Sequence, residues 1–396
     1  MSLRTLQSIG LAFGLVLIGC GSPAADVDGE SAASTSEALS SRAKHLAKSE
    51  EFAHLDVFPA GVAAGEDVVF VGTVLEGRVL ALSRDSGRQI GELPPPPGGF
   101  VLAFIMHSIG PNRIAVLDAG GFPSPKPFVP ASPKIYEYEY RLSHGRFSAS
   151  LVRTVSFDEV LIGFSEDMVS LGGGRYLLSD AVLGSIWQVE ADGSIRPGIV
   201  PRTFEPEDAI PSMVFCDTMP LIEVGGLPFL FTASTVPGVS PLAVRDGTVY
   251  FYSPCAGGTF RFPLRILSDK RHPSERARDI RLVASKPKDV AVEELLEFTF
   301  NPFDRDDDHI YAADALKLRV IRMDPKTGKR EIVGDDPRLF NFPSSLGFAP
   351  PRKHSEKSTL FVVSNQQHRT TITNDAITED VLELPFIVTK VEIADR

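Results

Sequence analysis

Long stretches rich in Ala, Leu, Glu and Lys are missing from this chain of 396 residues, which argues against a helical bundle. Hydrophobic residues make up 43% and charged residues 23% of the sequence, so its bulk is neither intrinsically disordered nor a polytopic membrane protein. An excess of basic residues is missing too, since 40 basic and 51 acidic residues give a net charge of −11. Because that charge repels phosphate backbones, we do not expect nucleic acid as a partner.

Two common catalytic motifs are also missing. No Gly-rich phosphate loop leads from a strand into a helix, and no Gly-x-Ser-x-Gly elbow occurs. The chain does contain 33 Gly and 31 Pro residues. These residues interrupt regular structure at short intervals, and they favour a fold of many short strands.

The first 19 residues have the features of an export signal. Arg4 provides a positive start, and residues 9–18 form an apolar core that is shorter than the ~20 residues of a membrane span. The core ends at Leu17-Ile18-Gly19-Cys20, which resembles the lipobox of bacterial lipoproteins. The resemblance implies cleavage before Cys20 and acylation of its thiol, so that only lipid would hold the protein at a membrane. The alternative is a plain secretory peptide in which Cys20 is incidental.

Residues 20–50 are rich in Ala, Ser, Gly, Glu and Asp, and they predict a flexible tether between anchor and domain. In lipoproteins, a residue such as Gly21 after the cysteine indicates sorting to the outer membrane. We therefore expect a lipid-anchored protein of the bacterial cell envelope, on the periplasmic face of the outer membrane. Because that compartment is oxidising, Cys216 and Cys255 form either a disulfide or two buried free thiols.

One strand type recurs six times, and two further strands precede each copy. The recurring strand has the pattern Gly-x-aliphatic-x-x-aliphatic or a close variant, and polar turn residues follow it. Its copies are residues 77–82, 134–138, 184–189, 258–262, 318–323 and 387–391. The strands directly before them are more apolar and comprise residues 68–73, 114–118, 176–180, 249–253, 310–314 and 360–364. The first strands of the units are residues 61–63, 104–106, 167–169, 242–244, 289–291 and 345–347.

Three ordered strands per unit, with room for a fourth, are typical of the blade of a β-propeller. For residues 51–396 we therefore predict an all-β fold, a six-bladed β-propeller with about four antiparallel strands per blade. Residues 54–59 precede the first inner strand, and we expect them to form the outer strand of the last blade and close the ring.

Several blades resemble those of the senescence-marker-protein/gluconolactonase-like superfamily, together with related NHL-type and strictosidine-synthase-like propellers. The resemblance rests on residues 178–189, 289–292, 310–314 and 319–328, and as a six-bladed pattern it covers roughly residues 54–395. It implies the fold. It leaves the activity open, because such propellers include lactonases, phosphotriesterases, lyases and non-catalytic binding modules.

In the hydrolases of that superfamily, one Glu, two Asn and one Asp hold a calcium ion in the channel mouth, and Ca²⁺ prefers such oxygen ligands. The resemblance places the first-blade Glu at Ala60 and the fourth-blade Asn at Ser240, which are poor counterparts. It places the third-blade ligand at Glu166 or Asp167, and the fifth-blade Asp at Asp289. Glu166 and Asp289 are therefore the candidate Ca²⁺ ligands.

The channel mouth, at the rim where the inner strands start, also supplies the candidate residues for catalysis and substrate binding. Without a metal, Glu166, Asp167 and Asp289 would serve as general base and acid. His107, just after an inner strand, is a further candidate for proton transfer. The candidate substrate-binding residues are Lys288, Ser240 and Ser344. Lys288 either lowers the pKa of a nearby carboxyl group, binds an anionic substrate, or replaces Asp289 at the ligand position.

Three long insertions, residues 121–133, 195–239 and 366–385, fall mostly on the rim where the inner strands start. They predict a lid over the central channel. In contrast, Asp118, Asp180 and Asp314 recur at the ends of second strands, and we expect them to accept hydrogen bonds from turn amides.

Two functions fit this pattern. The first is a membrane-tethered enzyme of the gluconolactonase-like type that hydrolyses or rearranges a small ester or lactone, with assistance from Ca²⁺. The alternative is a non-catalytic propeller lipoprotein that binds a small ligand or another protein of the cell envelope.

Overall fold

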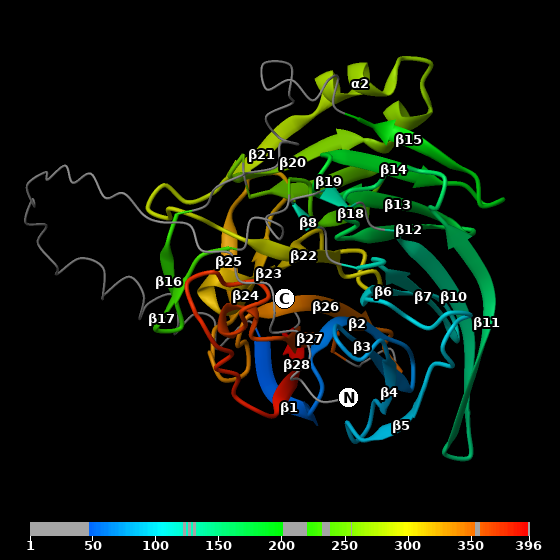
Figure 1. Ribbon diagram of the computed structural model, residues 1–396, viewed down its shortest axis with the longest axis vertical. Helices are drawn as coiled ribbons and strands as arrows, with labels where there is room; N and C mark the ends of the chain where they lie inside the picture. Colours follow the sequence, from blue (N-terminus) through cyan, green and yellow to red (C-terminus); the bar gives the residue numbers. More distant parts are fainter. Residues whose placement is uncertain are drawn as a thin grey trace, which may run out of the picture. The chain divides into compact units, whose positions relative to one another are not determined.

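Six four-stranded antiparallel sheets are arranged in a ring (Figure 1). The computed structural model describes residues 47–121, 124–125, 128–129, 132–200, 220–231, 238–254, 256–352 and 357–394. In Figure 1 the inner strands β2, β6, β12, β18, β22 and β26 surround the centre of the ring. The chain is a six-bladed β-propeller, as the sequence predicts.

Each blade is an antiparallel meander that runs from the inner to the outer edge of its sheet. Blade one is β2 (Pro59–Ala64), β3 (Val68–Thr73), β4 (Val79–Ser83) and β5 (Gln89–Glu92). Blade two is β6 (Ala103–Gly110), β7 (Arg113–Asp118), β10 (Lys134–Ser143) and β11 (Arg146–Ser156). Blade three is β12 (Met168–Gly172), β13 (Arg175–Asp180), β14 (Ser185–Val189) and β15 (Ile195–Ile199).

The second half of the ring has the same organisation. Blade four is β18 (Leu242–Arg245), β19 (Thr248–Ser253), β20 (Gly258–Pro263) and β21 (Arg281–Ser285). Blade five is β22 (Leu295–Phe300), β23 (Ile310–Asp314), β24 (Arg319–Met323) and β25 (Arg330–Gly334). Blade six is β26 (Pro343–Ala349), β27 (Thr359–Ser364), β28 (Phe386–Ile393) and β1 (Ala47–Leu55).

Short elements occupy the connections between these strands. Two small hairpins consist of β8 (Ser124–Pro125) with β9 (Phe128–Val129) and β16 (Ile222–Val224) with β17 (Leu227–Phe229). The described helices are η4 (Leu264–Ser268), α2 (Pro273–Arg276), η5 (Ala277–Asp279), η6 (Ala315–Lys317) and η7 (Gln367–Arg369). None of the helices in the described ranges is long and apolar enough to cross a membrane.

Strand β1 closes the ring by pairing antiparallel with β28, from Ala47 opposite Ile393 to Leu55 opposite Phe386. The expectation that the segment before blade one completes blade six is confirmed. The segment begins earlier than predicted, because residues 47–55 rather than 54–59 form the strand.

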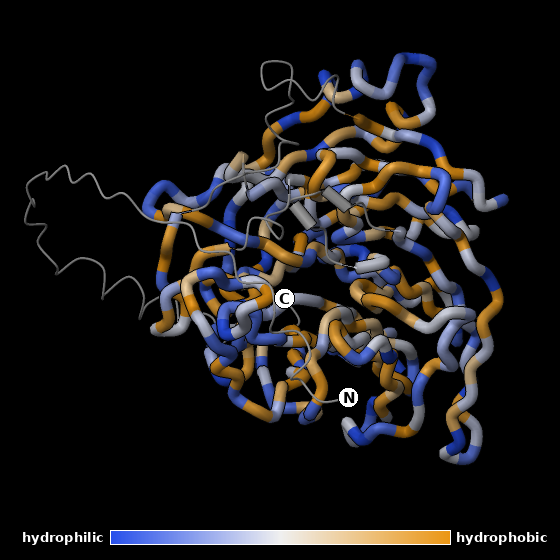
Figure 2. The backbone as a smooth tube through the Cα atoms, in the orientation of Figure 1, coloured by the Kyte–Doolittle hydropathy of each residue, from blue (hydrophilic) through white to orange (hydrophobic). Residues whose placement is uncertain are grey.

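Each pair of neighbouring blades shares its own hydrophobic core. Along β3, Val69 and Val71 pack in the core between blades six and one, while Val68 and Phe70 pack in the core between blades one and two. Because side chains alternate along a strand and both faces of a blade are covered, all six residues of β3 are buried. Figure 2 shows the hydrophobic residues along the strands, with hydrophilic residues mostly in the outer turns.

Two of the recurring aspartates connect the end of a second strand to the segment that enters the same blade. Asp118 accepts hydrogen bonds from the amides of Val101 and Leu102, both at 2.8 Å. Asp180 accepts hydrogen bonds from the amides of Gly163 and Phe164. The structural role predicted for these two is confirmed. Asp314 differs, because it pairs with the side chain of Arg319 at 2.7 Å.

The predicted inner strand of blade five is wrong. Residues 289–291 lie in the loop after β21, and β22 begins at Leu295. All other predicted inner, second and third strands overlap observed ones. The predicted tether, residues 20–50, extends too far, because residues 47–50 belong to β1. Residues 1–46, Cys216 and Cys255 lie outside the described residues, so the export signal, the rest of the tether, the acylation of Cys20 and the disulfide remain predictions.

The closing strand provides a test of the ring. Ala53 of β1 is 7% exposed and packs in the core between blades six and one. We expect Ala53→Asp to lower the free energy of unfolding by at least about 2 kcal/mol, because it places a charge in an apolar environment. The exposed neighbour His54 provides the matched control, and His54→Asp should change stability by less than about 0.5 kcal/mol. Equal urea midpoints for the two variants would contradict this account of closure.

Candidate functional site

The residues directly before the inner strands lie at one rim of the ring, since all six blades run from the inner to the outer edge. Glu166 lies two residues before β12, Ser240 lies two residues before β18, and Glu294 directly precedes β22. All three residues are buried. Blades three, four and five therefore each bring a polar side chain to the mouth of the channel.

Glu166 and Glu294 are unusual because both carboxyl groups are buried and neither has a cationic partner among the described residues. Glu294 is 0% exposed, and neither of its carboxylate oxygens has a hydrogen-bond partner among the described residues. Burial raises the pKa of Glu294 well above its usual value, and the negative charge of Glu166 raises it further. Burial also raises the pKa of Glu166 to about 8, with Asp167 as the second cause.

The neighbouring Glu293 is a useful contrast. Its carboxylate pairs with Arg330 and accepts a hydrogen bond from the hydroxyl of Tyr252 at 3.0 Å. Glu293 therefore has a structural partner on each side, whereas Glu294 has none in the described part of the chain.

A small cavity lies beside Glu166. Its walls are mostly apolar, with a few polar side chains. They are formed by Phe104, Ile105, Phe164, Glu166, Phe231, Leu296, Ser344, Gln367 and Thr373. Convergent polar groups in an apolar pocket are typical of small-molecule sites.

Two of the predicted lid insertions reach this cavity. Phe231 belongs to the insertion after blade three, whereas Gln367 and Thr373 belong to the insertion in blade six. The two insertions are joined by Asn374, whose side chain accepts a hydrogen bond from the amide of Leu230 at 3.1 Å and donates one to the Pro228 carbonyl at 3.0 Å. The third insertion, residues 121–133, is described only in part, because residues 122–123, 126–127 and 130–131 lie outside the described residues.

A buried histidine lies within the lid. His368 is 0% exposed, its ring stacks on that of Phe342 with centroids 5.5 Å apart, and neither ring nitrogen has a hydrogen-bond partner among the described residues. Burial lowers the pKa of His368 to about 3, and the charge of Arg369 lowers it further.

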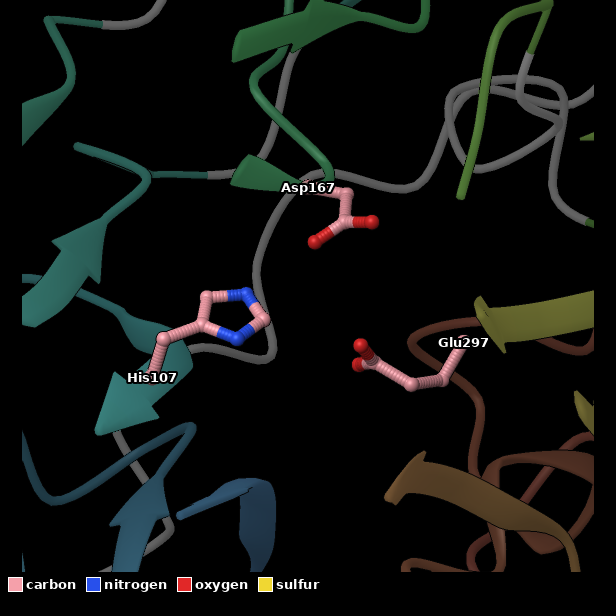
Figure 3. Close-up of side chains that lie close together, drawn as sticks. All are labelled: His107, Asp167 and Glu297. Carbon is pink, nitrogen blue, oxygen red and sulfur yellow. The ribbon is translucent and has the colours of Figure 1, made fainter. Parts of the chain in front are cut away.

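Farther along the inner strands, a second group of side chains meets in the channel (Figure 3). Figure 3 shows His107 of β6, Asp167 before β12 and Glu297 of β22 pointing toward one another. One nitrogen or oxygen atom from each lies within 4.8 Å of the others. Burial raises the pKa of Asp167 to about 8 and lowers that of His107 to about 4, so neutral forms of both are favoured.

The structure brings some of the predicted site residues together and leaves others apart. Glu166 and Ser344 line the same cavity, whereas Asp167 and His107 meet in the deeper group. Lys288 and Asp289 are exposed in the loop before β22. The prediction that these two residues lie in the channel is wrong, because it depended on an inner strand at residues 289–291, whereas that strand begins at Leu295.

Three positions that the sequence analysis assigned to the mouth are Ser240, Ser344 and Ala60. Ser240 is buried and its hydroxyl has no hydrogen-bond partner in the described ranges. Ser344 donates a hydrogen bond to the carbonyl of Ala60 at 3.2 Å. Ala60 itself is buried and supplies no side-chain ligand.

Sequence reasoning missed Glu294 and Glu297. The signal was the run Glu293-Glu294-Leu295-Leu296-Glu297 directly before a strongly apolar stretch. The pairing of β22 with β23 shifts register between Leu295 and Phe298, which indicates a bulge next to Glu297. A bulge redirects side chains, so simple alternation does not identify which of these glutamates face the channel.

The donor set at the mouth fits a hard cation. Glu294 offers two buried oxygens that have no hydrogen-bond partner in the described part of the chain, Glu166 offers another carboxylate, and Ser240 offers a hydroxyl. Oxygen donors are the ligands that Ca²⁺ prefers. Glu294 directly precedes the inner strand of blade five, where the resemblance led us to expect Asp289.

The sequence matches no protein-family model and no curated protein. Solved structures with a similar fold include a luciferin-regenerating enzyme, with 11% identity, a TM-score of 0.51 and coverage of 87% of this chain and 95% of that one. A Bacteroides thetaiotaomicron protein of unknown function has 11% identity and a TM-score of 0.55, with coverage of 88% and 76%. A gluconolactonase from Xanthomonas campestris has 13% identity and a TM-score of 0.49, with coverage of 89% and 93%. At these identities, the two structures with TM-scores above 0.5 support the fold alone.

The lid histidine provides a pH test. The unfolded chain protonates His368 below about pH 6.5, whereas the folded chain does not until about pH 3, so folded stability should fall as the pH decreases from 6.5. This effect is about 2 kcal/mol at pH 5. In His368→Phe, which keeps the stacking on Phe342, that part of the decrease should vanish. Thermal unfolding of both proteins between pH 4 and pH 8 measures the difference, and parallel curves would contradict the assignment.

Proposed function

We propose that the chain is an enzyme that hydrolyses or rearranges a small ester- or lactone-like substrate in the mouth of the channel. The observation that supports it is the pair of interacting, buried carboxyl groups of Glu166 and Glu294, contributed by two different blades. Glu166 also lines a cavity with mostly apolar walls. Burying two acidic groups without a partner is costly, and such arrangements concentrate at functional sites.

The residues of this chain divide the chemistry between them. Without a bound metal, burial raises the pKa of Glu166 to about 8, close to neutral pH, which suits a group that both donates and accepts a proton. Phe104 and Phe164 present apolar walls to the carbon skeleton of a substrate, and Phe231 of the lid limits the access of water.

A bound cation would complete the site. Glu166 and Glu294 would hold Ca²⁺, which when bound would polarise a substrate carbonyl oxygen. The positive charge would also offset the repulsion between the two carboxylates and favour their ionised forms.

The runner-up function is a non-catalytic propeller that binds a small ligand or a protein of the cell envelope through the same mouth. Ala60 and Ser240 favour it, because at these two mouth positions the chain has an alanine and a serine in place of strong ligands. In that case the cavity would bind its ligand without converting it.

Turnover of a panel of aliphatic lactones, sugar lactones and p-nitrophenyl esters distinguishes the two functions. Calorimetry measures Ca²⁺ binding by the same proteins. We expect Glu166→Gln and Glu294→Gln each to lower turnover by about 100-fold or more and to weaken Ca²⁺ binding, because each removes an ionisable carboxyl group from the mouth. Asp289→Asn is the matched control and should alter neither. Turnover that survives both mouth substitutions would refute the catalytic assignment. Ligand binding without turnover in the unmodified protein would support the runner-up.

We also propose that lipid on Cys20 anchors the propeller to the bacterial outer membrane through the segment from Cys20 to residue 46, just before β1. The proposal is supported by the apolar run that ends at Leu17-Ile18-Gly19-Cys20. In a bacterial host, the unmodified chain should incorporate radiolabelled palmitate and fractionate with the outer membrane, whereas Cys20→Ala should do neither. Soluble, unlabelled protein from the unmodified chain would instead indicate a plain secretory peptide.

A further inference from the structure

The group formed by His107, Asp167 and Glu297 contains donors from three different blades. One donor atom of each lies within 4.8 Å of the other two, and Asp167 and Glu297 are 0% and 1% exposed. Carboxylates next to an imidazole, away from bulk water, need either shared protons or a cation to offset their charge. The orientation of each side chain distinguishes these two possibilities.

A backbone hydrogen bond orients the imidazole of His107 and leaves the lone pair of one ring nitrogen available. Its Nε2 atom lies 2.5 Å from the carbonyl oxygen of Met168. Because a carbonyl oxygen only accepts hydrogen bonds, Nε2 carries the hydrogen of the neutral ring, and Nδ1 therefore keeps its lone pair. A backbone carbonyl that fixes the tautomer in this way is typical of histidines that bind metals.

Glu297 provides a carboxylate oxygen that is available as a metal ligand. Its Oε1 atom is buried and has no hydrogen-bond partner among the described residues, whereas Oε2 accepts a hydrogen bond from the hydroxyl of Ser345 at 3.3 Å. The same hydroxyl accepts a hydrogen bond from the amide of Val62 at 3.0 Å. Blades six and one therefore orient the carboxylate and leave one oxygen unused.

Asp167 is oriented by two backbone amides. Its Oδ1 accepts a hydrogen bond from Met168 at 2.7 Å, and its Oδ2 accepts one from Leu242 at 2.5 Å. Each carboxylate oxygen has a second lone pair, so these bonds position the group without using up its capacity as a ligand.

We propose that His107, Asp167 and Glu297 form a binding site for a divalent first-row transition metal, with Zn²⁺ as the best match, inside the channel and separate from the mouth. Zinc lies about 2.0–2.2 Å from imidazole nitrogen and carboxylate oxygen, so three donors this close surround it after small side-chain rotations. The nitrogen ligand favours zinc over calcium, which prefers oxygen ligands throughout.

This site is independent of the proposed enzyme function. The ion links blades two, three and five across the channel and offsets the charge of two buried carboxylates. Three protein ligands leave one coordination position for water.

The test uses the full-length chain after treatment with a chelator. Calorimetry measures its titration with Zn²⁺, and visible absorption measures its titration with Co²⁺. We expect one equivalent of Zn²⁺ that raises the melting temperature, and a Co²⁺ spectrum typical of bound nitrogen and oxygen ligands. Glu297→Gln is nearly isosteric and keeps an acceptor for Ser345. It should weaken Zn²⁺ binding by at least about tenfold and abolish the zinc-dependent rise in melting temperature.

Two further variants locate the ion. His107→Gln should remove the imidazole contribution to the X-ray absorption of bound zinc, whereas Glu294→Gln at the mouth should leave Zn²⁺ affinity unchanged. The proposal is overturned if the unmodified chain binds no stoichiometric Zn²⁺, which would indicate a proton-sharing group. It is also overturned if Glu294→Gln rather than Glu297→Gln abolishes binding, since the ion would then occupy the mouth.

Discussion

The antiparallel pairing of β1 with β28 is the contact on which the ring depends. It joins the first described strand to the last, and it completes the core in which Ala53 and Leu55 pack beside Phe386. Without it, blade six would have an unpaired edge and blades six and one would share an incomplete core. Closure therefore sets the positions of all six inner strands, and with them the geometry of the channel.

The channel concentrates negative charge where water is scarce. Glu166, Asp167, Glu294 and Glu297 are all buried, and the pKa of each is raised above its usual value mainly by burial. A fold gains no stability from such groups unless protons or cations offset their charge. Their presence on blades three and five, beside apolar walls, is the strongest sign that the channel has a function beyond holding the blades together.

The lid connects this channel to two long insertions of the chain. Asn374 joins the insertion after blade three to the insertion in blade six, and both insertions contribute side chains to the cavity that contains Glu166. Because loops of this kind can change without disturbing the inter-blade cores, the lid is where the selection of a particular ligand would reside.

The sequence by itself determined the number of blades, since six repeats of alternating strands can bury both faces only by packing against one another. It also placed Glu166 and Asp167 just before or at the start of an inner strand and His107 near another, and the structure has them just before β12 and within β6. Their roles remain predictions. Glu294 and Glu297 were decided only by the tertiary structure. The start of β22 depends on a bulge and on packing against blade four, and neither leaves a periodic signal in the chain. The meeting of His107 with Glu297 likewise depends on ring closure, which brings together residues 190 positions apart in the sequence.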